Sequence, residues 1–357
     1  MTGSSGSRQD DFSGTKEVAE ALRFDVLRLE SYLASQLSGF TPPLRVSQFK
    51  GGQSNPTYLL ETPGKNYVLR RKPPGKLLPS AHAVDREFRV LSALHATAFP
   101  VPGTHLLCED ESIIGTVFYV MDFMAGRIFW DPLLPGLANA ERAAIYDAMN
   151  ATLAKLHACK PEALGLSDFG RPGNYFARQI ARWSKQYLAS ETERVDEMNQ
   201  LIDWLPRHVP EDEDVAIVHG DYRLDNMIFR DTNTELLAVL DWELSTLGHP
   251  LADFTYHLIA WRMPLATGRG MAGADLQSLG IPSEEDYVAA YCRRTGRPGI
   301  ANMDFYMAYN LFRFAAIIQG IIGRVRDGTA ASEHAASYAA TVRPLAEQGW
   351  SYAKAAH

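Results

Sequence analysis

The most constraining feature of this chain is a polar loop that lies between two apolar runs. Residues 218–229 read V-H-G-D-Y-R-L-D-N-M-I-F, which places Asp221 and Asn226 in the spacing H-G-D-x-x-x-x-N. A further apolar run, Leu236–Leu240, leads directly into Asp241. Short neighbouring strands would bring these two carboxylates and the amide oxygen together. The pattern therefore predicts a general base beside ligands for magnesium.

Composition limits the class of protein and its partners. The 357 residues leave room for a large core and two lobes, and 46% hydrophobic with 22% charged residues is typical of a soluble globular protein. A net charge of -7 argues against nucleic acid as a partner. The three cysteines lack C-x-x-C spacing, so we expect neither a disulfide framework nor a zinc site, and a reducing cytoplasm is the expected compartment.

The sequence shows neither a targeting signal at its start nor an apolar stretch long enough to span a membrane. Residues 1–14 are rich in Ser, Gly and Asp and contain no apolar stretch, so no signal peptide is expected. We expect residues 1–24 to form a disordered or weakly ordered tail. The most apolar helical stretch, Phe314–Ile322, is too short to cross a bilayer and is followed by Arg324 and Arg326. No membrane partner is therefore expected.

The order of predicted elements indicates two lobes. Residues 25–124 are predicted to form a small β-rich lobe with one main helix: a first helix from Asp25 to Leu37, strands over 44–49, 57–61, 67–71 and 116–123, and the main helix over 82–97. Residues 125–357 are predicted to be mainly helical, with helices over 141–157, over 175–188 and after Ser283, and a β-rich stretch over 215–241. The fold class is therefore α+β.

A glycine-containing loop separates the first two strands of the small lobe. Gly51 and Gly52 would let backbone N–H groups approach phosphate oxygens closely, and Ser54 and Asn55 could add donors. Two glycines between strands are also typical of a simple hairpin, so the loop alone does not define a phosphate site. It matches neither a Walker A loop nor G-x-G-x-x-G.

The polar loop and the run that follows it resemble the H-R-D-L-x-x-x-N and D-F-G motifs of kinases. Gly220 stands where those kinases have arginine, and Asp241-Trp242-Glu243 replaces D-F-G. These departures are similar to the aminoglycoside phosphotransferase and choline kinase branch of the protein-kinase-like fold. Residues 248–253, G-H-P-L-A-D, resemble the G-D-P-x-x-D segment of that branch, with His249 in place of the first aspartate. The resemblance implies a two-lobed fold with its active site in the cleft.

The resemblance also implies roles for the residues of the large lobe. Asp221 is expected to be the general base, and Asn226 and Asp241 are expected to hold Mg²⁺ beside ATP. Glu243 is expected to belong to the metal site too, either binding a second metal ion or supporting the ligands of the first. His219 is expected to orient the loop by hydrogen bonding, and Asp253 to anchor it from a buried position.

In the small lobe, the strand Y-V-L-R of residues 67–70 takes the place of the kinase V-A-I-K strand. Arg70 is then expected to contact the phosphates and to pair with Glu87, although arginine is bulkier than the lysine usual in the family. Arg71 remains an alternative, because adjacent strand residues point to opposite faces. The connector between the lobes is expected to bind the adenine edge through its backbone at residues 122–124, namely Asp122, Phe123 and Met124.

Four further stretches narrow the resemblance: R-K-P-P-G-K at 71–76, F-W-D-P at 129–132, Y-F-A-R-Q at 175–179 and W-E-L-S-T at 242–246. They resemble the phosphotransferase module that occurs fused to acyl-CoA dehydrogenases. That likeness implies a hydroxyacyl-CoA as acceptor. A catalytically weak nucleotide-binding scaffold and an aminoglycoside kinase remain alternatives, whereas a protein kinase and a metal-dependent hydrolase are disfavoured. ATP versus GTP and the oligomeric state stay open.

An anionic acyl-CoA would need cations beside an apolar groove in the large lobe. Two predicted helices carry residues suited to this: Arg178, Trp183, Lys185, Arg313, Gln319 and Arg324. The alternative is that these residues only cap or solvate their helices. An aminoglycoside is a polycation and would instead need an acidic acceptor cleft.

Overall fold

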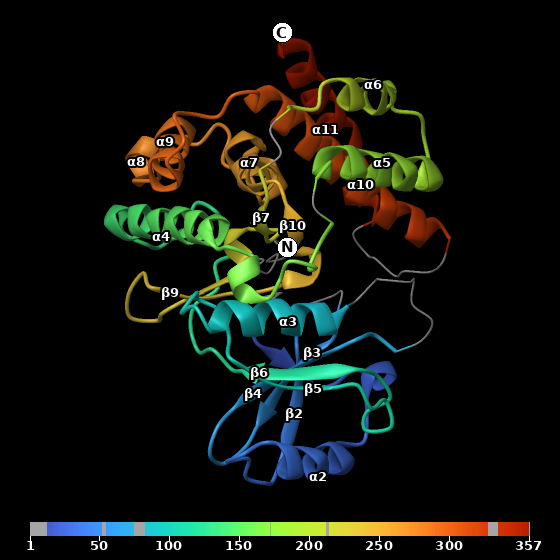
Figure 1. Ribbon diagram of the computed structural model, residues 1–357, viewed down its shortest axis with the longest axis vertical. Helices are drawn as coiled ribbons and strands as arrows, with labels where there is room; N and C mark the ends of the chain where they lie inside the picture. Colours follow the sequence, from blue (N-terminus) through green and yellow to red (C-terminus); the bar gives the residue numbers. More distant parts are fainter. Residues whose placement is uncertain are drawn as a thin grey trace, which may run out of the picture.

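An antiparallel six-stranded sheet forms the smaller of two lobes (Figure 1). The computed structural model describes residues 13–51, 55–74, 83–171, 173–211, 214–327 and 335–356. The sheet has the order β1-β2-β3-β4-β6-β5. Its strands are β1 (Thr15–Lys16), β2 (Arg45–Phe49), β3 (Thr57–Glu61), β4 (Tyr67–Arg71), β5 (Thr104–Cys108) and β6 (Phe118–Asp122). A parallel, doubly wound sheet would have contradicted the predicted architecture.

Side-chain alternation in β4 divides the small lobe into two faces. Leu69 belongs to a separate core beneath α2 (Val26–Gln36), whereas Val68 joins the main core beneath α3 (Val84–His95). Figure 1 shows α2 at the far end of this lobe and α3 between the sheet and the helical lobe. Arg70 and Arg71, which follow these residues, must therefore point to opposite faces of the sheet.

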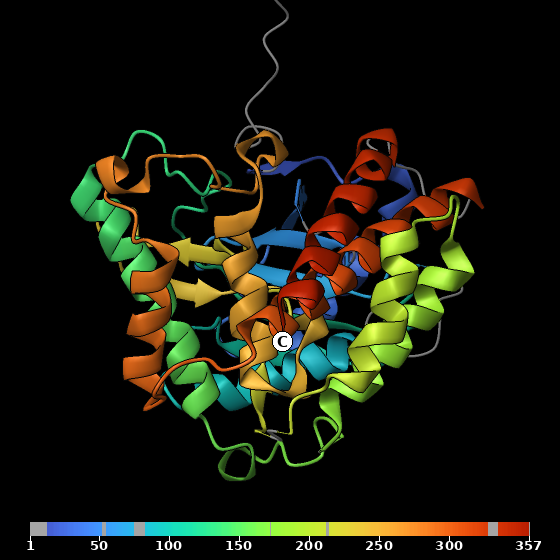
Figure 2. The same cartoon turned by 90° about the horizontal axis from the view of Figure 1, so that it is seen from above.

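The larger lobe is mainly helical. Its helices are α4 (Asn139–Ala158), α5 (Tyr175–Ser190), α6 (Asp196–Trp204), α7 (Pro250–Arg262), α8 (Leu276–Leu279), α9 (Glu284–Thr295), α10 (Met303–Arg326) and α11 (Ala335–Ala355). The larger lobe also contains short 3-10 turns: η2 (Glu162–Leu164), η3 (Leu205–Arg207), η4 (Leu224–Asn226), η5 (Trp242–Leu244) and η6 (Leu265–Thr267). A further 3-10 turn, η1 (Glu20–Leu22), lies between β1 and α2. Figure 2 shows α10 and α11 side by side next to α5 and α6, with α4 and α9 on the other side of α7.

Two small two-stranded sheets lie where the lobes meet (Figure 1). The strand β7 (Ala216–Val218) pairs with β10 (Thr246–Gly248), and β8 (Met227–Phe229) pairs with β9 (Leu236–Val239), both antiparallel. The H-G-D-x-x-x-x-N loop connects β7 to β8, and Asp241 follows β9. The polar residues predicted from the sequence therefore lie just after the ends of short strands, where the two lobes meet.

The start of the chain departs from prediction. Within residues 1–24, expected to form a weakly ordered tail, Thr15 pairs with Phe49 and Lys16 with Gln48 as an added edge strand. The short β5 was not predicted either. Backbone hydrogen bonding along a sheet edge requires no alternation of apolar side chains, so neither strand leaves a clear sequence pattern.

Among the described residues, α10 is the one helix that is long and apolar enough to span a membrane. This helix is longer than the apolar stretch Phe314–Ile322 identified from the sequence. Most of its apolar part is buried against the rest of the protein. The core helix of a globular protein can have the same length and composition.

Candidate active site

A cleft of about 900 Å³ lies between residues of both lobes. This volume is within the range of small-molecule binding sites. Its walls include predicted site residues from distant parts of the sequence: Gly51, Arg70, Asp122, Phe123, Met124, Asn226 and Asp241. Gly52 and Ser54, also predicted to contact phosphate, lie outside the described residues. The structure thus gathers most of the predicted nucleotide and metal residues in one cleft.

Arg70 is the centre of a buried charge cluster. Its Nε lies 2.7 Å from Oε2 of Glu87, its Nη2 pairs with the Asp241 carboxylate, and Glu243 is 3.7 Å away. Burial alone would lower the pKa of Arg70, but the carboxylates of Glu87 and Asp241 outweigh it and hold the pKa well above its usual value. The arginine therefore stays charged and joins a residue of α3 to the proposed metal-binding aspartate.

Glu87 is satisfied by neutral groups as well as by Arg70. The Asn55 amide donates to Oε1 at 2.8 Å, and the Tyr119 hydroxyl donates to Oε2 at 3.0 Å. Burial raises the pKa of Glu87, although Arg70 opposes this effect. The same Asn55 amide also donates to Glu243 at 3.4 Å. Asn55 was expected to face phosphate, but its amide is directed at carboxylates instead, because the side chain is wholly buried.

Arg71 lies on the opposite side of the sheet. Its guanidinium donates to the Tyr58 hydroxyl at 3.1 Å and to the carbonyls of Leu22 and Ile114 at 2.7 and 3.2 Å. These partners belong to the small-lobe face away from the cleft. Of the two candidate arginines, Arg70 is therefore the one that lines the cleft.

A buried carboxylate holds the loop of residues 219–226. Asp253 accepts hydrogen bonds from the backbone N–H groups of His219 and Gly220 at 2.7 and 2.8 Å, as the sequence predicted for an anchor. Arg313 donates to the Gly220 carbonyl at 2.6 Å. Gly220 has φ 85°, and a Cβ there would lie 2.8 Å from the Leu244 carbonyl oxygen. Only glycine fits this turn without moving the backbone.

His219 orients the loop through hydrogen bonds of its ring. The ring is fully buried, its Nδ1 accepts from the Asp221 N–H at 3.2 Å, and its Nε2 lies 2.8 Å from the Leu240 carbonyl. These partners define the tautomer with the proton on Nε2. The histidine thereby connects the loop that bears Asp221 to the segment that presents Asp241.

The Asp221 carboxylate is oriented by three groups. The Tyr256 hydroxyl donates to Oδ1 at 2.8 Å, Arg223 Nε lies 3.0 Å from Oδ1, and the Asn226 amide donates to Oδ2 at 3.2 Å. Burial would raise the pKa of Asp221, but the Arg223 charge and the Tyr256 hydrogen bond outweigh it, and the pKa lies below its usual value. Asp221 is therefore ionised at neutral pH, as a general base must be.

Sequence reasoning missed Arg223 and Tyr256. Arg223 also pairs with Asp225 at 3.4 Å, and it lies within the loop, where its charge could have been noticed. Tyr256 comes from α7 and reaches Asp221 only through the tertiary fold. No local pattern in the sequence predicts that contact.

The residues predicted to hold magnesium fit that ion. The Asn226 amide nitrogen donates to the Asp221 carbonyl at 2.9 Å and to Oδ2 of Asp221 at 3.2 Å, so the amide oxygen is the atom suited to a metal ion. Asp241 adopts φ 65°, an uncommon backbone conformation that costs about 1–3 kcal/mol and is concentrated at functional sites. The described part of the chain contains no group of three or more His, Cys, Asp or Glu side chains placed to hold a metal ion together. Magnesium needs only one or two carboxylates when substrate phosphates complete its shell.

The expected acceptor surface is not formed by the six residues proposed for it. Trp183, Arg313 and Gln319 are buried, and Gln319 donates to the Ser190 carbonyl at 2.6 Å and to Thr192 Oγ1 at 3.0 Å. Arg178 donates to backbone carbonyls of residues 171 and 173. Lys185 and Arg324 are exposed. The set serves mainly packing and capping, which is the alternative left open in the sequence.

Comparison with known proteins shows to which family and to which proteins the chain is related. The model of the phosphotransferase enzyme family matches residues 45–306. Acyl-CoA dehydrogenase family member 10 of Mus musculus is 46% identical over 342 residues, covering 95% of this chain and 32% of that protein. Acyl-CoA dehydrogenase family member 11 of Rattus norvegicus is 45% identical, covering 94% of this chain and 44% of that protein. The chain thus spans less than half the length of these relatives.

Solved structures show the same fold. A Ralstonia eutropha protein assigned to the aminoglycoside phosphotransferases is 51% identical, with a TM-score of 0.86 over 94% of this chain and all of that one. An aminoglycoside phosphotransferase solved with ADP and hygromycin B is 16% identical, with a TM-score of 0.58 over 91% of this chain and 98% of its own. The two-lobed α+β architecture is therefore protein-kinase-like, and the chain belongs to the phosphotransferase enzyme family.

Proposed function

We propose that the protein transfers the γ-phosphate of ATP to a hydroxyl group of a small molecule, with Mg²⁺ as cofactor. The observation that carries this proposal is the convergence of Arg70, Asn226 and Asp241 in one cleft, with Asp221 bonded to Asn226. Kinase-type phosphoryl transfer requires a cation for the phosphates, oxygen ligands for magnesium and a base for the acceptor. A catalytically weak scaffold would not need an oriented, ionised Asp221.

In the proposed reaction one bond to the γ-phosphorus forms and one breaks, and Asp221 takes up the proton that is released. Asp221 accepts the proton of the acceptor hydroxyl, whose oxygen forms a bond to the γ-phosphorus. The bond between that phosphorus and the β,γ-bridging oxygen breaks, and ADP departs with the electron pair. Asn226 and Asp241 would hold Mg²⁺, which neutralises phosphate charge when bound. Glu243 lies close enough to Arg70 to assist in positioning this cluster.

The nucleotide is proposed to lie in the 900 Å³ cleft, with adenine at the connector after β6. The Asp122 N–H donates to the Gly103 carbonyl at 2.8 Å, so the backbone N–H groups proposed to meet adenine are those of Phe123 and Met124. The Asp122 side chain pairs with Lys65 and His105, away from this role. A related fold was solved with ADP, which supports nucleotide binding by this fold.

The acceptor is proposed to be a hydroxyacyl-CoA, in a cytoplasmic setting. The names of the relatives suggest acyl-CoA chemistry, although the dehydrogenase activity of those longer proteins does not follow for this chain. The walls beside Asp221 are largely apolar, and the Arg223 charge there is paired with Asp221 and Asp225 at 3.0 and 3.4 Å. A polycationic aminoglycoside would be attracted to an acidic site instead.

The test compares two acceptors under identical conditions. Phosphate transfer from ATP is measured with a 4-hydroxyacyl-CoA and with kanamycin, each with Mg²⁺ and with excess chelator. We expect magnesium-dependent transfer to the acyl-CoA at the higher rate. Faster turnover of kanamycin would reject the acyl-CoA acceptor, and nucleotide binding without transfer to any hydroxyl compound would support the scaffold alternative.

A further inference from the structure

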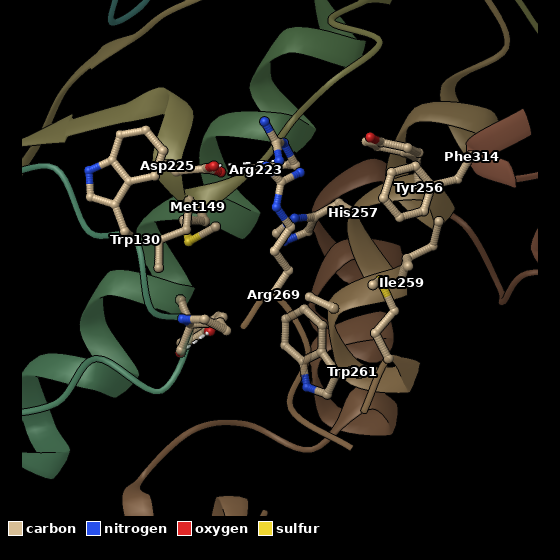
Figure 3. A pocket seen from close by; sticks show the side chains of 15 residues that line it. Trp130, Met149, Arg223, Asp225, Tyr256, His257, Ile259, Trp261, Arg269 and Phe314 are labelled. Atoms are coloured by element: carbon tan, nitrogen blue, oxygen red, sulfur yellow. Dashed lines mark hydrogen bonds and ion pairs between the residues drawn. The ribbon is translucent and has the colours of Figure 1, made fainter. Parts of the chain in front are cut away.

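A second, smaller pocket of about 70 Å³ lies beside the catalytic loop. Figure 3 shows Trp130 and Met149 on one side of it and Tyr256, Ile259 and Phe314 on the other. Its walls come from the segment after the connector, from α4, from α7 and from α10. Most of these side chains are apolar or aromatic, and the charged Arg223 and Asp225 pair with each other at 3.4 Å, so the pocket is suited to hydrocarbon.

The pocket is joined to both parts of the active site. Trp130 and Asp225 line this pocket and also the nucleotide cleft. Tyr256 and Arg223 line it while contacting the Asp221 carboxylate at 2.8 and 3.0 Å. A carbon whose hydroxyl reaches Asp221 would therefore have its next substituent at the mouth of this pocket.

We infer that this pocket, the alkyl slot, receives the short aliphatic group attached to the hydroxyl-bearing carbon of the acceptor. The inference rests on the proposed function and adds the feature of the acceptor that the site selects. Aromatic and aliphatic walls exclude water from this group and leave its hydroxyl facing Asp221. The remainder of the acyl-CoA then extends away from the slot.

The volume of the alkyl slot sets the length of chain that it admits. An engineered apolar cavity of about 150 Å³ holds benzene, a molecule of six carbons. A slot of about 70 Å³ is roughly half as large, so it holds about three carbons. Each methylene that enters contributes about 0.8 kcal/mol, or about a fourfold gain in binding. Chains longer than the slot must displace close-packed side chains, which opposes binding.

The test uses 4-hydroxyacyl-CoA substrates that differ only in the alkyl group beyond the hydroxyl-bearing carbon, from methyl to pentyl. For the parent protein we expect kcat/KM to rise about fourfold per carbon up to propyl. A fall of about tenfold or more is expected at butyl or pentyl, in line with the discrimination that a filled hydrophobic pocket gives.

Two substitutions change the slot in opposite directions while keeping the polar groups that bond to Asp221. Phe314 packs edge-on against the Tyr256 ring, with 6.4 Å between the ring centroids, so the length preference within each variant is compared rather than its absolute rate. Phe314→Ala widens it and should move the preferred length to butyl or pentyl, whereas Ala260→Leu fills it and should leave methyl preferred. Ile322→Ala, on α10 but outside the slot, is the matched control and should keep the parent profile. Melting temperatures identify any variant that loses its fold.

The outcomes separate this inference from the proposed function. A parent profile that does not depend on chain length, or one that Phe314→Ala and Ala260→Leu both leave unchanged, overturns the slot. Absence of phosphorylation across the whole series rejects the proposed acceptor class. In that case calorimetric binding of the same series still decides about the slot, which requires a length preference that Phe314→Ala shifts to longer chains.

Discussion

Removal of Arg70 should destabilise the small lobe through the partner that it leaves behind. The Arg70 and Glu87 side chains are 8% and 1% exposed, so Arg70→Met strands a carboxylate in the interior. Breaking a buried pair in this way costs about 3–5 kcal/mol. With a urea dependence of about 3 kcal/mol/M, the unfolding midpoint should fall by more than about 1 M.

A second substitution should restore most of that loss. In Arg70→Met/Glu87→Gln the stranded charge is gone, while the Gln side chain can still bond to Asn55 and Tyr119. We expect the double variant to regain about 2 kcal/mol or more relative to Arg70→Met, since the penalty comes from an unpaired charge rather than from lost contacts. Asp241 also loses a partner, but it is 29% exposed and water can replace it.

Urea unfolding and nucleotide titration are measured on the same five proteins: the parent, Arg70→Met, Glu87→Gln, the double variant and the control Arg71→Met. ATP affinity should stay weak in the double variant even though its stability returns, because the phosphate cation is still missing. Arg71→Met is the control, since it should lose stability while the folded fraction binds ATP normally. A double variant no more stable than Arg70→Met would refute the reasoning.

Three further predictions concern charge. Arg223→Gln should move the acid limb of the kcat/KM profile to higher pH, because Arg223 helps to hold the Asp221 pKa low; an unmoved limb would contradict this. Burial lowers the His257 pKa to about 4, so stability should be complete above about pH 6.5 and fall by about 3 kcal/mol as pH drops through 4. Urea unfolding of His257→Gln should show a flatter profile in that window, and an equally steep one argues against His257. Asp241→Asn should weaken magnesium-dependent ATP binding, and equal magnesium dependence in variant and parent would exclude this ligand.

The sequence was most informative where a local pattern determines the element. The bounds of β3 and β4 agree with prediction, because apolar residues flank the turn P-G-K-N at 63–66 and leave little freedom in register. The H-G-D-x-x-x-x-N spacing likewise identified the loop between β7 and β8, because its polar residues interrupt two apolar runs. The catalytic and metal roles given to its residues remain predictions.

Contacts that arise only in the folded chain could not be predicted. The sequence showed that Arg70 and Arg71 point to opposite faces, but only the position of α3 determines which face borders the cleft. The orientation of Asp221 by Tyr256 joins residues 35 positions apart in the chain. Asn55 was assigned to phosphate from its place in a loop, whereas its burial beside Glu87 depends on how the sheet packs against α3.

The most direct test of the account is single-turnover phosphate transfer by Asp221→Asn, compared with the parent at saturating ATP and acceptor. ATP affinity should be nearly unchanged, because Arg70, Asn226 and Asp241 are intact. The rate of transfer should fall by about 10²–10⁴, the usual contribution of general acid–base catalysis. Transfer at close to the parent rate would contradict the central claim that Asp221 is the base.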